Sequence, residues 1–88
     1  MKLLKEIERI FPKVEKILTE ERLAEFLRTP YADLDKYDFG LGTMIKLKLL
    51  KPKNKIYLTF VENGIADRDI MAKIIIRDFH KSRRSPIF

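Results

Sequence analysis

Apolar residues in the first part of the chain recur at intervals of three and four, which is the spacing of one helical face. Leu3, Leu4, Ile7 and Ile10 follow this spacing, and charged residues separate them. Pro12 interrupts the run, and proline is tolerated best in the first turn of a helix. The pattern therefore predicts two short helices, the second of which starts near the proline.

A third helix is predicted by the residues at its two ends. Thr19 stands before two glutamates. A threonine hydroxyl there can accept a hydrogen bond from a first-turn amide, and the acidic residues favour the positive end of the helix dipole. Thr29-Pro30 is expected to end this helix, because the residue before a proline is disfavoured in the helical conformation. Residues 31–38 are expected to form a single turn or a short helix.

Residues 44–61 fit two alternatives. Residues 45–49 alternate apolar and basic side chains, and residues 56–61 are rich in strand-favouring types, which by propensity predicts a β-hairpin. The alternative is two helices, with Asn54 capping the second and Asn63-Gly64 ending it. A two-stranded hairpin needs a third strand or a packed helix, and no other segment offers a strand. This consideration favours helices.

The last predicted helix begins at Asp67 or Asp69 and runs to about Arg84. Its buried stripe is expected to consist of Ile70, Met71, Ile74 and Ile75, with Phe79 and Ser82 as further candidates. The opposite side is expected to carry Asp69, Lys73, Arg77, His80, Lys81 and Arg84. We thus predict one all-α domain over residues 1–88 with four or five short helices and a loose tail at 82–88. An α+β domain with a hairpin at about 44–61 is the alternative.

Positive charge is concentrated in the second half of the chain. The 88 residues contain 19 basic and 13 acidic side chains, a formal net charge of +6. Residues 45–88 contain eleven of the basic and four of the acidic ones, a net +7 that leaves the first half at −1. Such clusters attract polyanions or acidic proteins, although a solvated surface is the simpler alternative. The candidate contact residues are Lys46, Lys48, Lys51, Lys53, Lys55, Lys73, Arg77, Lys81 and Arg84.

Composition argues against most kinds of chemical site. Without cysteine there is no thiolate ligand or cysteine nucleophile, and the single His80 cannot form a histidine pair within one chain. Asp33, Asp35 and Asp38 lack the glycine and closing glutamate of a calcium loop. The Gly40-Leu41-Gly42 motif lacks the lysine and hydroxyl residue of a phosphate-binding loop and is interpreted as a turn or a close packing contact. We therefore predict no catalytic, cofactor or metal site.

Several motifs follow one another between residues 31 and 81. They are Tyr37-Asp38-Phe39-Gly40-Leu41-Gly42, Asn63-Gly64-Ile65, Asp69-Ile70-Met71, Ile74-Ile75-Ile76 and Phe79-His80. Together they resemble a family of small uncharacterised bacterial domains, a domain of unknown function. This chain departs from that family at Asp38, where the family often has histidine, at Ala72, where it often has serine, and over 43–48. The resemblance implies an all-helical fold, and it implies no activity and no ligand.

The sequence favours a non-catalytic interaction or regulatory domain. Its many large aliphatic residues suggest a surface that binds another protein or a second copy of the chain. Small accessory proteins encoded by mobile elements or phages have this size and composition. The alternative is a nucleic-acid-binding protein that uses a basic loop at 46–55 and the basic face of the last helix. A cytoplasmic location is expected, because no signal-peptide pattern is present and no apolar run approaches the roughly 20 residues of a membrane span.

Overall fold

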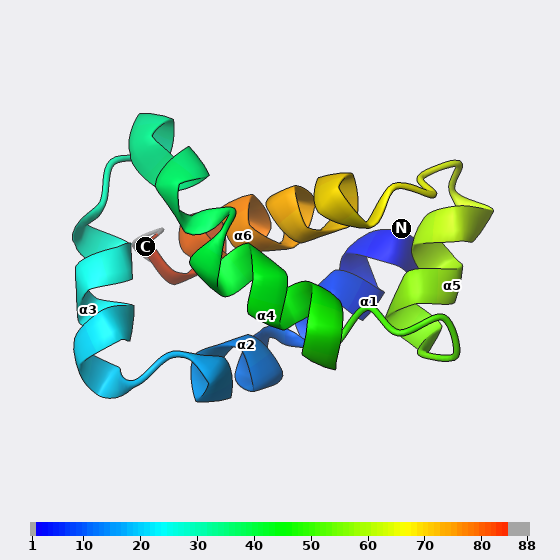
Figure 1. The fold of residues 1–88 in the computed structure, drawn as a ribbon, viewed down its shortest axis with the longest axis horizontal. Coiled ribbons are helices and arrows are strands. Elements are labelled where there is room, and N and C mark those ends of the chain that lie inside the picture. The colour runs from blue at the N-terminus through cyan, green and yellow to red at the C-terminus, as the bar shows by residue number, and fades with distance from the viewer. Residues whose placement is uncertain (1, 85–88) are drawn as a thin grey trace.

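The computed structural model describes residues 2–84, which form six α-helices and one 3-10 helix (Figure 1). The elements are α1 (Lys2–Arg9), α2 (Phe11–Ile17), α3 (Glu20–Arg28), the 3-10 helix η1 (Tyr31–Tyr37), α4 (Gly40–Lys48), α5 (Lys55–Glu62) and α6 (Arg68–Arg84). No residue in this range belongs to a strand, so the predicted all-α class is confirmed, with more helices than expected. The hairpin alternative is wrong, because residues 44–61 contain the end of α4, a short loop and α5. No helix within residues 2–84 is long and apolar enough to cross a membrane.

Local signals set several helix ends as the sequence predicts. The Thr19 hydroxyl accepts a hydrogen bond from a first-turn amide of α3 at 3.2 Å. Asp67 accepts the backbone N–H of Asp69 at 2.8 Å and so caps α6. Gly64 ends α5 with a φ of 83°, in the left-handed region that glycine adopts without strain. Asn54 stands at the start of α5 but does not cap it, because its side-chain amide donates to the Leu49 carbonyl instead, at 2.8 Å.

Helix α6 is the longest element, and it runs along α4 and η1 and also contacts α1 and α3 (Figure 1). Its buried residues follow two neighbouring lines at a spacing of four: Met71, Ile75 and Phe79, then Ala72, Ile76 and His80. The predicted stripe was therefore displaced by part of a turn. Ile70 and Ser82 are exposed and Ile74 is only half-buried. The reason is that α6 packs between elements on two sides. Residues 74–76 are all isoleucine, so the sequence does not show which of them face those elements.

The C-terminal end of α6 includes Ser82 to Arg84, where the sequence suggested the start of a loose tail. The remainder of that predicted tail lies outside the described residues.

An aromatic cluster joins four elements of the core. The ring of Phe26 in α3 lies 4.8 Å from that of Tyr37 in η1, 5.8 Å from Phe79 and 5.1 Å from His80, both in α6. Phe11 in α2 meets Phe79 edge-on at 5.4 Å. Aromatic pairs in this range are worth about 0.5–1.5 kcal/mol beyond their burial. The cluster thus fixes how α2, α3 and η1 lie against α6.

Candidate functional site

The basic line predicted on α6 exists, but its first two members, Lys73 and Arg77, form ion pairs. Lys73, Arg77 and Lys81 follow one another at a spacing of four on α6. One Asp38 carboxylate oxygen lies 3.3 Å from an Arg77 guanidinium nitrogen, and the other lies 3.8 Å from the Lys73 ammonium. Asp38 directly follows η1. Lys73 and Arg77 therefore connect α6 to the residue that follows η1. Their spacing within α6 alone does not indicate this contact, because Asp38 comes from a distant part of the chain.

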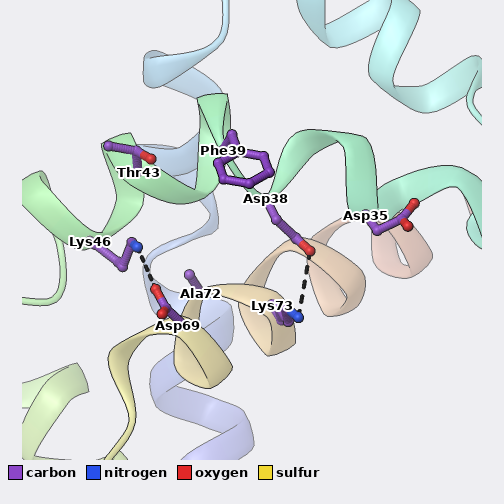
Figure 2. Close-up of a pocket in the computed structure, with 8 residues that line it drawn as sticks. All are labelled: Asp35, Asp38, Phe39, Thr43, Lys46, Asp69, Ala72 and Lys73. Atoms are coloured by element: carbon purple, nitrogen blue, oxygen red, sulfur yellow. Dashed lines mark hydrogen bonds and ion pairs between the residues drawn. The ribbon is translucent and has the colours of Figure 1, made fainter.

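A hollow of about 480 Å³ opens between η1, α4 and α6, beside these pairs. Figure 2 shows Lys46 directed at Asp69 and Lys73 directed at Asp38, with Ala72 between the two pairs. The hollow is lined by Asp35, Asp38, Phe39, Thr43, Lys46, Asp69, Ala72 and Lys73. A phosphate group placed here would lie beside three carboxylates and only two ammonium groups, so the hollow suits an anion poorly.

Lys46 donates a hydrogen bond to the Asp69 carboxylate, and this bond together with the positive charge lowers the pKa of Asp69 below its ordinary value of 3.8. A pKa lowered by folding stabilises the folded chain above the unfolded pKa, and the contribution is lost as the pH falls through the folded pKa. The Asp69→Asn variant should therefore melt at a slightly lower temperature than wild type at pH 7. The difference should shrink once the pH falls below 3.8 and vanish only below the lowered pKa of folded Asp69. Thermal melts at several pH values test this, with Asp33→Asn, an exposed carboxylate of η1, as the control.

The other predicted cluster, residues 46–55, is not a single loop. Its first three positions belong to α4 and its last begins α5, so only Lys51 and Lys53 are lysines of the connecting segment. The Lys55 ammonium lies 3.6 Å from the Glu6 carboxylate of α1. Of the nine predicted contact residues, the five that form no ion pair with a described residue are Lys48, Lys51, Lys53, Lys81 and Arg84.

His80 is a core residue rather than a residue of the basic side, where the sequence placed it. Its ring is 2% exposed, and Nε2 lies 2.7 Å from the backbone carbonyl of Thr29. A carbonyl oxygen only accepts, so Nε2 carries the proton and donates. The Arg84 guanidinium reaches the same carbonyl at 3.4 Å. Among residues 2–84 there is no group of three histidine or carboxylate side chains that could hold a metal ion.

Phe39, which stands just before α4, was not among the predicted contact residues. Its side chain is 86% exposed, and it borders both the hollow of Figure 2 and a second hollow on the other side of α4. Met44 and Leu47 on α4 are also exposed, at 37% and 61%. Leu41 and Ile45 form the buried face of α4. Met44 and Leu47 therefore lie on its outer side. The available signal was a phenylalanine between an aspartate and a glycine, which places it at a turn rather than within a helical face.

The described residues thus form a small all-α domain with an exposed apolar surface around Phe39 and with ion pairs among its charged side chains. The chain belongs to the family described as Domain of unknown function (DUF6794), whose model matches residues 5–83. The expected membership of a family of unknown function is thereby confirmed, and the match begins well before Tyr37, where the first of the quoted motifs starts. Neither the curated proteins nor the solved structures include a significant match to the chain.

Proposed function

We propose that this domain is a non-catalytic protein-binding module with Phe39 at the centre of its contact surface. The observation that carries the proposal is the 86% exposure of this ring at the start of α4. Covering such a side chain removes apolar surface from water and is worth about 1.5–3 kcal/mol. Aromatic residues, phenylalanine among them, and methionine are enriched in the buried core of protein interfaces. Met44 and Leu47 extend this surface along α4.

The pairing of the basic residues supports a protein partner over a nucleic acid. Lys46, Lys73 and Arg77 already contact carboxylates, so a phosphate backbone would have to compete with these ion pairs for the same cations. The alternative function, nucleic-acid binding, would depend on the predicted contact residues that form no ion pair with a described residue, Lys48, Lys51 and Lys53 together with Lys81 and Arg84 of α6. It predicts an affinity that falls steeply as salt is added.

The test is a comparative pull-down from the source cell with wild type, Phe39→Ala and the matched control Leu58→Ala. Leu58 lies on α5 and is 48% exposed, so its truncation also removes exposed apolar surface, but on a helix that lines neither of the hollows that Phe39 borders. We expect Phe39→Ala to retain about tenfold less partner, which corresponds to roughly 1.4 kcal/mol. Leu58→Ala should retain the wild-type amount. Both variants should unfold within about 0.5 kcal/mol of wild type, because exposed side chains contribute little to stability.

Two results would contradict the proposal. One is full retention of the partner by Phe39→Ala. The other is the recovery of no protein together with a monomeric mass in light scattering, which would also exclude a second copy as the partner. Salt-sensitive binding of labelled DNA or RNA, lost in a Lys51→Ala/Lys53→Ala variant, would favour the alternative function.

A further inference from the structure

Two hollows adjoin along helices α2 and α4 and together form a groove. One has a volume of about 740 Å³ and the other about 350 Å³, and both are lined by Ile17 of α2 and Met44 of α4. Figure 1 shows α4 alongside α2, with α3 at one end of the pair, and α2 and α4 are in contact. Phe39 borders the larger hollow. The groove therefore starts at the residue on which the proposed function rests and continues along α4.

The floor of the groove is apolar. Leu18, Leu41 and Leu49 lie beneath it and are nearly buried, while Ile17 and Met44 are partly open to solvent. A ligand that places apolar side chains here would extend the hydrophobic core outward and remove Ile17 and Met44 from water. The larger hollow is within the size range of binding pockets, roughly 300–1,000 Å³.

The rim of the groove is positively charged. Its charged residues are Lys13, Lys16, Arg22, Glu25, Lys36 and Lys48, five basic and one acidic. None of the five basic side chains forms an ion pair with another residue in the described part of the chain. They differ in this from Lys46 and Lys73, which line the hollow of Figure 2 and are paired. An apolar floor within an unpaired basic rim is complementary to an acidic amphipathic ligand.

The backbone of this fold indicates the form of that ligand. Residues 2–84 contain no strand, so they offer no sheet edge to which an extended peptide could add a strand. A helix satisfies its own backbone groups and binds through one apolar face. The nine residues of α4 span about 14 Å, which corresponds to two to three turns of a helix lying alongside. We propose, on the basis of the proposed function, that the α2–α4 groove binds an acidic amphipathic helix of a partner protein.

The experiment selects ligands from a displayed library of random 16-residue peptides, with the immobilised full chain as bait. We expect enriched peptides to be acidic and to carry apolar residues at helical spacing. The best peptide, labelled with fluorescein, is then titrated with each variant and followed by anisotropy. Met44→Glu, which places a carboxylate on the floor, and Lys16→Glu/Lys48→Glu, which reverses two rim charges, should each weaken binding at least tenfold. The matched controls Leu58→Glu and Lys51→Glu/Lys53→Glu should bind within twofold of wild type, and circular dichroism should show equal helicity for all variants.

The groove proposal is overturned if no peptide is enriched, if the enriched peptides are basic or neutral, or if Met44→Glu binds as wild type does. Its failure is distinguishable from failure of the proposed function. A cellular partner that needs Phe39 but is neither displaced by the peptide nor affected by Met44→Glu leaves the protein-binding function intact and overturns the groove. A dimeric mass of the chain that the peptide converts to monomer would identify the helix as belonging to a second copy, and this also overturns the proposal of a separate partner.

Discussion

Replacing Phe26 with alanine is expected to lower the free energy of unfolding by about 3–5 kcal/mol. The ring is fully buried and contacts aromatic rings of both η1 and α6, so its removal opens a cavity where three elements meet. A domain of this size has a total stability of about 5–10 kcal/mol, so the loss takes a large share of it.

Urea denaturation followed by circular dichroism measures this loss. Leu23→Ala is the matched control, because Leu23 lies on the same helix but is only half-buried, and we expect it to lose less than half as much. A loss below about 2 kcal/mol for Phe26→Ala would mean that the cluster collapses around the vacancy, against the close packing described above.

The second large effect is expected for His80→Leu, which should cost about 2–3 kcal/mol. Leucine fills similar space but cannot donate to the Thr29 carbonyl, which would keep only the longer contact from Arg84. A buried acceptor that loses its partner costs about 1–3 kcal/mol, and the edge-on contact with Phe26 is lost as well.

His80→Gln separates the hydrogen bond from the packing. Its amide can donate to the same carbonyl, so Gln should recover part of the stability that Leu loses, measured in the same urea titrations. Equal stability of His80→Leu and wild type would show that the hydrogen bond contributes nothing net. In that case His80 would serve only to fill space.

Helix ends could be predicted from the sequence because their signals are local. Thr19 and Gly64 act on amides and carbonyls within a few residues, so each position carries its own evidence. The buried face of α6 could not be predicted in the same way. Residues 74–76 are all isoleucine, and which of them faces inward depends on where α1 and α4 pack.

The candidate site was harder to predict because it depends on contacts between distant residues. Asp38 and Arg77 are 39 positions apart, and only the packing of η1 on α6 brings them together. The net charge of each half of the chain also gives no sign of the unpaired basic residues at the rim of the groove. Lys13 and Lys16 belong to a first half with a net charge of −1, yet they line the groove with Lys48 from the second half.

The ion pairs of Asp38 have a consequence for the residue that follows it. Asp38 is held by two cations of α6, and three residues after Phe39, Gly42 is buried close to Ile76 of α6. The backbone on both sides of Phe39 is thus already positioned before any partner arrives. On binding, the ring would give up only its own rotamer freedom, about 0.5–1.5 kcal/mol, with no further cost for ordering a loop. An aromatic side chain presented in this way is preorganised, so the free energy from its burial would be offset by this rotamer cost and not by the ordering of the backbone.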